Sequence, residues 1–384
     1  RPGIQQMTSS GEAAAINTDV IIVGAGPAGA AAALTLLTYS DLRVTLVEQA
    51  DLNDVRVVEY VDADILDLLG YLKLAQSDFP VETFLPCFRQ TSYWGSDEPL
   101  SAQNLFDTDK QAFRLDREKF DFVLLGHVAA RGGLVFSRTR CSEYSQGEDH
   151  NWQLSLKNRS QGKFLLNGRY LIDACGRKAD VCRQVGVISA RHDKLMGVGA
   201  FFHFDKTRKI KQEQVMESHE LGWWYCARLP DQRQVVTFFS DADIIGQHRL
   251  NQAANWQQLL AQSRHIKLGG KGEAVLSAAP WVRNASSHIT HSVQRKNFIA
   301  IGDAAASFDP ISAMGLNFAM TSACHGARVV QTQLYSSDQQ SKQAELDGYQ
   351  QEVVDHFEQY LRLRKKCYSH EHRWSGATFW SRRR

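Results

Sequence analysis

The segment from Asp19 to Gly29 reads DVIIVGAGPAG and is the strongest indication of the fold class. The residues between Asp19 and the first glycine are all apolar, which is typical of a parallel strand covered on both faces. Gly24 allows a tight turn, Gly26 lets the backbone approach a pyrophosphate, and Gly29 lets the following helix pack closely on the sheet. A pyrophosphate would lie at the positive N-terminus of that helix. The glycines alone are weak evidence, because glycine-rich turns occur in many α/β proteins.

The residues that follow strengthen this interpretation. Residues 28–38 are predicted to form the helix, and residues 43–48 are predicted to form the next strand, which ends in Glu48. A carboxylate at that place can accept hydrogen bonds from the ribose hydroxyls of an adenosine. Strand, turn, helix and acidic residue together predict a dinucleotide site. Its expected contacts in this region are Gly24, Gly26, Pro27, Ala28, Gly29, Glu48 and Gln49.

A second motif near the end of the chain favours a flavin over a nicotinamide cofactor. Residues 298–302 (FIAIG) are predicted to form a strand that brings Asp303 to the sheet edge, where its carboxylate can bind a ribityl hydroxyl. The chain then turns into a long helix, whose N-terminus would stabilise an anionic reduced flavin. A strand-to-helix connection without a ligand is the simpler alternative, and the first motif argues against it. The expected cofactor is FAD, with Gly302, Asp303, Pro310, Met314 and Gly315 as contacts.

The bulk composition limits the other classes of protein. The 384 residues are 43% hydrophobic, which is enough for one large core or two interdependent domains. The net charge is +2, from 44 basic and 42 acidic residues, and gives no reason to expect a nucleic-acid partner. The seven cysteines show no C-x-x-C and no metal-ligand spacing, so we expect no metal site and reduced thiols in a cytoplasmic protein. No apolar run approaches the ~20 residues that cross a bilayer, and the polar residues 1–17 do not resemble a signal peptide, so we expect no membrane association.

These patterns predict an α/β protein with a Rossmann-like FAD-binding domain, an inserted antiparallel β-sheet and a C-terminal helical segment. Short β-rich stretches between residues 188 and 290 indicate the inserted sheet. The FAD-binding domain is expected to be discontinuous, over residues 18–84, 116–188 and 290–335. The substrate domain is expected over residues 85–115 and 189–289, and the helical segment over residues 336–384.

The two motifs together resemble those of class A flavin monooxygenases and of flavin-dependent tryptophan halogenases, over nearly the whole chain. Two further stretches share in the resemblance, RLDREKFD at residues 114–121 and DACGR at residues 173–177. The resemblance implies that Arg117, Asp173 and Gly176 lie near the FAD. Arg117 could equally be a surface arginine at the start of a helix.

The same resemblance separates hydroxylation from halogenation. Halogenases of this family are implied to use a lysine that captures hypohalous acid, with a glutamate nearby, and these positions fall here on Arg89 and Ser312. Arginine keeps its proton at physiological pH, so it cannot offer a free amine. The Trp-x-Trp-x-Ile-Pro stretch of the halogenases is replaced by GWWYCARLP at residues 222–230. These departures favour the transfer of oxygen from dioxygen to an electron-rich ring, with the flavin as redox cofactor.

Candidates for catalysis come from the predicted substrate sheet and from the segment before it. His203 alternates with two phenylalanines on a strand, so its side chain is expected to point away from both. Glu59 occupies the stretch where relatives carry a Gly-Glu pair beside the flavin, and it is the candidate base for removing a ring proton. Each aromatic candidate could instead belong to the core of the sheet. The expected catalytic residues are Glu59, Arg89, His203, Trp223 and Trp224, with Trp94 and Tyr225 as further candidates on the substrate side.

Three short segments are similar to those of LodB- and GoxB-like flavoproteins, which are encoded beside quinone-cofactor enzymes. They are GWWY at residues 222–225, YWGSDE at residues 93–98 and the terminal segment from Glu371. This resemblance implies hydroxylation of a tryptophan side chain in a partner protein, an early step in forming cysteine tryptophylquinone. The basic residues of the C-terminal segment could help to dock such a protein or could form a solvated helix face.

Three functions therefore stay open at this point. The first is a monooxygenase that acts on a peptidyl tryptophan in the precursor of a quinone-cofactor oxidase. The second is a monooxygenase, or less favoured a halogenase, of a small aromatic metabolite. The third is a flavin-binding assembly factor without turnover. The electron donor is either NAD(P)H or another reductant, since relatives bind NAD(P)H without a second GxGxxG motif.

Overall fold

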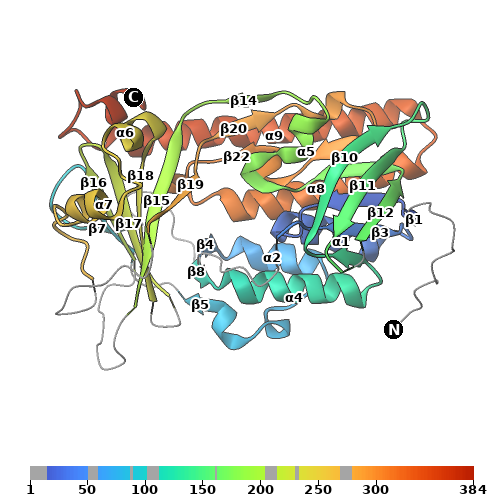
Figure 1. Ribbon diagram of the computed structural model, residues 1–384, viewed down its shortest axis with the longest axis horizontal. Coiled ribbons are helices and arrows are strands. Elements are labelled where there is room, and N and C mark those ends of the chain that lie inside the picture. Colours follow the sequence, from blue (N-terminus) through green and yellow to red (C-terminus); the bar gives the residue numbers. More distant parts are fainter. Residues whose placement is uncertain are drawn as a thin grey trace.

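The computed structural model describes residues 15–50, 59–86, 90–101, 112–160, 162–203, 214–229, 233–268 and 279–384. The molecule is elongated, with a helix-covered parallel sheet at one end and a seven-stranded sheet at the other (Figure 1). The space between these two parts is where the candidate site lies.

The predicted N-terminal strand–turn–helix unit forms the centre of the parallel sheet. Five strands follow the order β21-β13-β2-β3-β9, and every neighbouring pair is parallel. Four of them are buried along their whole length, as their apolar sequences predict. The strands are β2 (Val20–Val23), β3 (Val44–Val47), β9 (Leu134–Phe136), β13 (Tyr170–Asp173) and β21 (Phe298–Ala300). This order confirms the predicted α/β class with a Rossmann-like domain.

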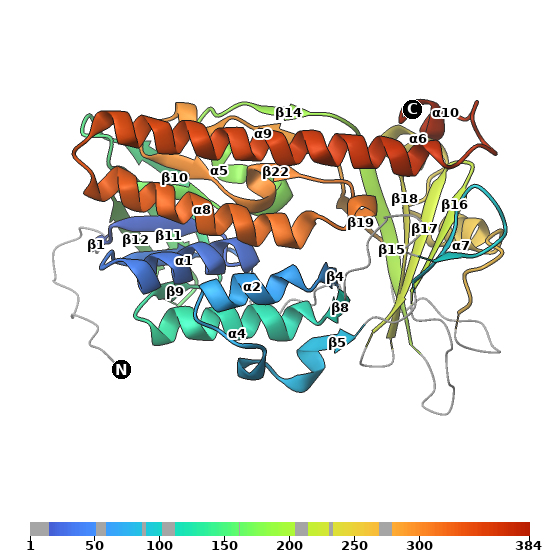
Figure 2. The ribbon, with the colours of Figure 1, turned by 180° about the vertical axis from the view of Figure 1, so that it is seen from behind.

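Helices cover this sheet and join the two ends of the molecule. The alanine-rich α1 (Pro27–Tyr39) packs against the sheet and contacts both α4 (Arg117–Ala130) and α8 (Gly315–Tyr335). The 31-residue α9 (Gln339–Ser369) lies alongside α8 and continues as far as the seven-stranded sheet (Figure 2). The other helices are α2 (Asp64–Tyr71), α5 (Asp180–Gln184), α6 (Ala242–Gln247), α7 (Ala253–Leu260) and α10 (Thr378–Ser381).

Three smaller sheets flank the parallel sheet. The first contains β1 (Ala15–Asn17), β12 (Gly162–Gly168), β11 (Trp152–Asn158) and β10 (Thr139–Gln146). The second contains β4 (Glu59–Asp62), β8 (Ala112–Leu115) and β5 (Phe84–Pro86). The third contains β14 (Ser189–Arg191), β20 (His288–Thr290) and β22 (Ala306–Ser307), and it leads into the second glycine motif.

The seven-stranded sheet is the inserted sheet that the sequence predicts. Its order is β19-β15-β18-β17-β16-β6-β7, and all pairs are antiparallel except β16 with β6. The strands are β6 (Gln90–Tyr93), β7 (Leu100–Ser101), β15 (Leu195–His203), β16 (Gln214–His219), β17 (Gly222–Arg228), β18 (Arg233–Asp241) and β19 (Trp281–Asn284).

The two faces of this sheet have different roles, because successive side chains of a strand point to opposite faces. On one face Trp224 is completely buried against α7, with its ring edge-on to Trp256 at a centroid distance of 5.3 Å. On the other face Trp223 points toward the parallel-sheet domain and lines a cavity. This corrects the prediction that Trp223 and Trp224 belong to one catalytic site, since Trp224 is a core residue of the outer face.

The last basic residues of the chain are engaged in internal ion pairs, whereas Arg362, Lys365 and Lys366 are exposed on α9, as expected for a solvated helix face. Arg383 is buried and places its Nη2 atom 2.5 Å from Asp241 Oδ1, while Arg382 pairs with both Asp241 and Asp243. Arg373 binds Glu371, which is completely buried. These residues fasten the end of the chain onto the inserted sheet, so most of their charge is not available for docking a partner.

None of the helices within the described ranges combines the length and the hydropathy that are required to cross a lipid bilayer. The six cysteines in those ranges, all except Cys87, are free thiols.

Candidate functional site

The first glycine motif is built for close backbone approach. Gly24 has a φ of +112°, and a methyl group there would overlap the carbonyl oxygen of Ala174 at the end of the neighbouring strand. A methyl group at Gly29 would overlap the carbonyl oxygen of Gly24. Both positions therefore require glycine, for the turn and for the packing of α1 on that turn.

The start of α1 is prepared for an anion. Its N-cap is Gly26, and its first turn, which is fully described, carries neither a side-chain cap nor an acidic residue. The free N–H groups and the positive end of the helix can therefore bind a pyrophosphate. Glu48 lies beside this turn, where its carboxylate accepts hydrogen bonds from the N–H groups of Ala25 (2.9 Å) and Ala50 (2.8 Å). The exposed Gln49 follows it, so both residues lie where the adenosine end of FAD is expected.

The second glycine motif lies directly against the first. Gly302 has a φ of +58°, and a methyl group there would lie 2.7 Å from Cβ of Ala28 in α1. The side chain of Asp303 is 26% exposed and lies 3.4 Å from Nε of Arg177. Burial raises the pKa of Asp303, and the charges of Arg177 and Arg117 oppose that rise. A partly accessible carboxylate at this junction can accept a hydrogen bond from a ribityl hydroxyl.

The loop from Phe308 to Gly315 ends in a second uncapped helix. The first turn of α8, described in full, again carries no side-chain cap and no acidic residue. Apart from the adjacent residues and the nearby backbone of α8 itself, no described atom lies within 4 Å of a methyl group placed at Gly315, so packing against other elements does not require this glycine. Ala313 adopts the left-handed conformation with a φ of +52°, which is unfavourable for a residue with a Cβ. A glycine facing open space beside a positive helix end fits the close approach of a flavin ring.

The DACGR segment (residues 173–177) forms a turn that places Arg177 next to Asp303. Asp173 is completely buried, and its carboxylate accepts hydrogen bonds from the N–H groups of Cys175 (2.9 Å) and Cys182 (2.8 Å). Asp173 therefore has no exposed surface for FAD and holds the turn instead. Gly176, with a φ of +70°, lets that turn bring Arg177 to Asp303 and to the carbonyl oxygen of Phe308 (2.8 Å).

Arg117 lies close enough to Asp303 to affect its pKa. Its guanidinium also binds both carboxylate oxygens of Asp121, at 3.0 and 3.1 Å, within the same helix. A direct contact between Arg117 and FAD stays a prediction.

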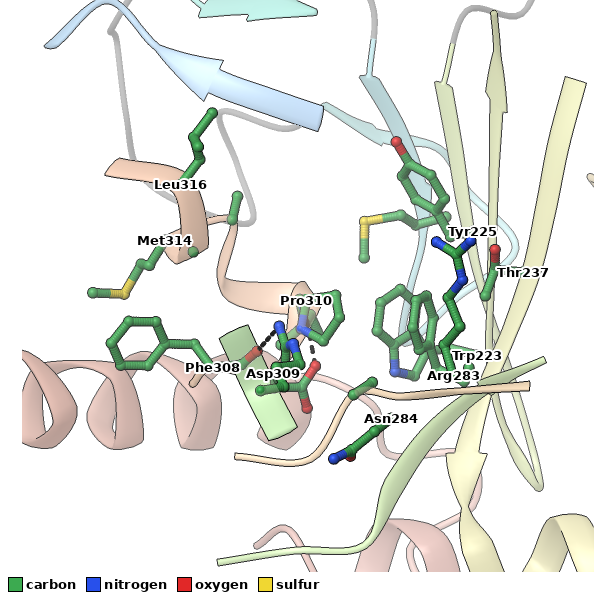
Figure 3. A pocket seen from close by; sticks show the side chains of 18 of the residues that line it. Trp223, Tyr225, Thr237, Arg283, Asn284, Phe308, Asp309, Pro310, Met314 and Leu316 are labelled. Atoms are coloured by element: carbon green, nitrogen blue, oxygen red, sulfur yellow. Dashed lines mark hydrogen bonds between the residues drawn. The ribbon is translucent and has the colours of Figure 1, made fainter. Parts of the chain in front are cut away.

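A cavity of about 300 Å³ separates the inserted sheet from the loop between Phe308 and Gly315, which we call the flavin-side loop. One wall is the loop and the start of α8, with Pro310, Met314 and Leu316; the other is the sheet, with Trp223, Tyr225 and Thr237 (Figure 3). The lining is mainly aromatic and aliphatic. Such a lining excludes water and suits a planar apolar ring.

Small residues in the sheet make room for the aromatic lining. Methyl groups at Gly197 and Gly199 would collide with the rings of Phe239 and Trp281, respectively. Arg283 also lines the cavity, and its guanidinium lies 4.9 Å from the centroid of the Trp281 ring. Stacking on an indole leaves the edge of the guanidinium able to donate hydrogen bonds.

The other predicted catalytic residues are described only in part. Glu59 begins β4, where its backbone pairs with Leu115, and His203 ends β15, where its backbone pairs with Arg233. Nothing further is described for the side chains of Glu59 and His203, and Arg89 lies outside the described residues. Their catalytic roles stay predictions. Trp94 is buried behind Trp223 and is not part of the cavity lining.

Several residues of the site could not be identified from the sequence. Asp309 is completely buried in the flavin-side loop and accepts a hydrogen bond from the hydroxyl of Tyr368, in the last turn of α9 (2.7 Å). Arg364 of the same helix lies 3.8 Å from Asp309 and 3.5 Å from Asp193. No motif or spacing marks these residues, because α9 returns to the site only in the tertiary structure.

The FAD binding domain family matches the chain over residues 17–363, so the chain belongs to this family and FAD is its cofactor. The site described above fits that cofactor, with two uncapped helix ends and glycines that allow its close approach. The protein is an FAD-dependent oxidoreductase.

Individual relatives agree with this class. The chain is 40% identical over 365 residues to LodB of Marinomonas mediterranea, assigned as an FAD-dependent oxidoreductase, with coverage of 95% of this chain and 96% of that protein. The fold is that of the flavin-dependent halogenase CmlS (TM-score 0.79, 23% identity, 96% of this chain and 68% of CmlS). It is also that of QhpG, a peptidyl tryptophan dihydroxylase essential for tryptophylquinone cofactor biogenesis (TM-score 0.70, 21% identity, 96% of this chain and 79% of QhpG).

Proposed function

We propose that this oxidoreductase is a monooxygenase that hydroxylates a tryptophan side chain of a partner protein, the precursor of a quinone-cofactor oxidase. The aromatic cavity beside the flavin-side loop is the observation that carries the proposal. At about 300 Å³ it lies at the small end of the range for ligand sites, which suits a single indole rather than a large metabolite. The similarity to LodB and the shared fold with the tryptophan-modifying QhpG support the same substrate class.

The residue at the position of the halogenase glutamate supports oxygen transfer over halogenation. That position is Ser312, which is buried in the flavin-side loop. Its hydroxyl donates a hydrogen bond to the carbonyl oxygen of Asp309 (2.9 Å). A serine that is hydrogen-bonded to the backbone cannot supply the carboxylate that a halogenase is implied to use.

The proposed reaction balances with one reductant and one dioxygen. A C–H bond of the indole is replaced by a C–OH bond, the second oxygen atom leaves as water, and NAD(P)H or another two-electron donor is oxidised. FAD supplies the redox chemistry when it is bound. The apolar cavity orients the ring and excludes water, and Glu59 is the proposed base for the ring proton that is lost.

The test is the intact mass of the product of a neighbouring oxidase gene, expressed with and without this protein. We expect a gain equal to one or two oxygen atoms that maps to a tryptophan. Coexpression with Glu59→Gln should lower that gain while FAD remains bound. No gain, with a soluble partner and bound FAD, would overturn the proposal in favour of a small aromatic substrate or an assembly factor. A gain equal to a halogen atom would identify a halogenase.

A further inference from the structure

A chain of two hydrogen bonds links the inserted sheet to the flavin-side loop through α9. The indole N–H of Trp223 donates to the hydroxyl oxygen of Tyr368 (3.0 Å), and that hydroxyl donates to Oδ2 of Asp309 (2.7 Å). The three residues come from β17, α9 and the loop before α8. All three are at most 1% exposed, so the chain is shielded from water.

The chemistry of the three groups determines the direction of these bonds. An indole N–H can only donate, so the Tyr368 oxygen accepts from Trp223 and its own proton points to Asp309. This arrangement favours the ionised form of Asp309. Burial raises the pKa of that carboxyl, the nearby Asp193 adds to the rise, and Arg364 and Arg383 oppose it. Burial also raises the pKa of Tyr368 well above its ordinary value, so Tyr368 keeps its proton.

Asp309 in turn organises the flavin-side loop. Its Oδ1 accepts the N–H of Ile311 (3.0 Å), and its carbonyl oxygen accepts both the N–H (3.0 Å) and the hydroxyl (2.9 Å) of Ser312. These bonds form the turn directly before Ala313, whose left-handed conformation must be held by its surroundings. The turn leads to Gly315 at the N-terminus of α8, where the flavin is expected.

We propose that Tyr368 is a positioning residue, which holds the flavin-side loop in place relative to the Trp223 wall of the cavity. Without its hydroxyl, Asp309 loses a partner inside the protein and the indole N–H of Trp223 loses its acceptor. The loop and the cavity wall would then adjust independently. The proposal depends on FAD binding, but not on the proposed substrate.

The test is a double-mutant cycle read out by FAD affinity and by the visible circular dichroism of bound FAD. Tyr368→Phe keeps the ring and removes the hydroxyl, and Trp223→Phe removes the indole N–H. We expect Tyr368→Phe to raise the Kd of FAD about tenfold, because FAD then has to order the flavin-side loop as it binds. Trp223→Phe should change the dichroism in the same sense, and it should have little further effect when Tyr368 is already Phe.

Trp94→Phe is the matched control. Trp94 packs beside Trp223 and donates its indole N–H to the carbonyl oxygen of Cys367 (2.9 Å), the residue before Tyr368 in α9. Trp94→Phe removes the same kind of hydrogen bond to the same helix but leaves the hydrogen bonds between Trp223, Tyr368 and Asp309 in place. Its effect should therefore add to that of Tyr368→Phe. Thermal unfolding of each apoprotein separates loss of fold from loss of positioning.

Two results would overturn the proposal. One is an unchanged FAD affinity and dichroism in folded Tyr368→Phe. The other is that the effects of Trp223→Phe and Tyr368→Phe on FAD affinity and dichroism add as fully as those of Trp94→Phe and Tyr368→Phe. If Tyr368→Phe does not fold, Asp309→Asn with Trp223→Phe provides a second cycle, because the neutral amide oxygen accepts a weaker hydrogen bond from Tyr368 than the carboxylate does. Additivity in that second cycle would likewise overturn the proposal.

Discussion

Gly302 lies against Ala28, so that a single added methyl group would bring two Cβ atoms to 2.7 Å. These residues belong to the two glycine motifs, which lie near opposite ends of the chain. Their contact brings the expected pyrophosphate site at α1 and the expected flavin site at α8 into one continuous binding surface. Predictions about cofactor binding follow from this contact.

Replacing Gly302 by alanine should abolish FAD binding. The residue would have to keep a φ of +58°, which costs an alanine about 1–2 kcal/mol, and its Cβ would push α1 away from the second motif. FAD retention after desalting and the apoprotein unfolding temperature measure the two effects. A variant that kept its FAD at wild-type stability would show that the two motifs can separate without loss of the site.

Replacing Gly315 by alanine should separate stability from cofactor binding. No described atom outside the adjacent residues and the nearby backbone of α8 lies within 4 Å of the added methyl group, and alanine favours a helix over glycine by up to about 1 kcal/mol. The apoprotein should therefore unfold at the same or a higher temperature, while the Kd for FAD rises because the methyl group occupies the approach of the flavin. An unchanged Kd would place the flavin away from the start of α8.

Substitutions at Trp224 in β17 and at Thr237 in β18, which lie on opposite faces of the inserted sheet, should have opposite effects on stability and on turnover. Trp224→Phe shrinks a core side chain on the outer face of the sheet, so we expect a loss of about 1–3 kcal/mol in stability and unchanged turnover per bound FAD. Thr237→Phe places a ring in the cavity and should lower hydroxylation about 100-fold by displacing the substrate, with FAD still bound. Chemical denaturation and partner mass gain measure the two outcomes, and the reverse pattern would contradict the assigned faces.

The pair formed by His325 of α8 and Glu352 of α9 should make stability depend on pH. The hydrogen bond to Glu352, with a smaller contribution from the charge of Glu345, raises the pKa of His325 above its ordinary value of 6.5. A raised pKa in the folded state means that the stabilisation is complete below pH 6.5 and is lost as pH rises through the raised value. Glu352→Gln should therefore cost about 1 kcal/mol at pH 6, allowing for partial exposure, and less at pH 8.

The control for that prediction is Glu358→Gln, which removes an exposed pair with Arg362 on the same helix. It should change the unfolding free energy little, and by the same amount at both pH values. A Glu352→Gln effect that did not shrink at pH 8 would mean that the charge of His325 is not the source of the stabilisation.

Arg383 should prove structural rather than partner-binding. Arg383→Met leaves the buried Asp241 with only its partly exposed partner Arg382, so we expect a loss of about 3 kcal/mol in unfolding free energy. The double variant with Asp241→Asn should lose less than the sum of the two single variants, as denaturant titrations would show. Strict additivity would mean that the two side chains do not stabilise each other.

The nucleotide-binding part of the fold could be predicted from local sequence patterns. The apolar run before Gly24, the glycine spacing and Glu48 are local signals, and together they predict a strand, a turn and a helix that meet a dinucleotide. The second glycine motif, which begins at Gly302, is also a local signal. Its strand and its helix could therefore be predicted without knowing what lies between the two motifs.

The arrangement of the cavity and of the inserted sheet depends on long-range packing that no local pattern predicts. Alternation along a strand places Trp223 and Trp224 on opposite faces, but the sequence could not say which of the two faces meets the flavin domain. Tyr368 and Asp309 likewise carry no signal of their own. They meet because a 31-residue helix returns from the flavin domain to the inserted sheet, and contacts between residues so distant in the chain depend on how whole elements pack together.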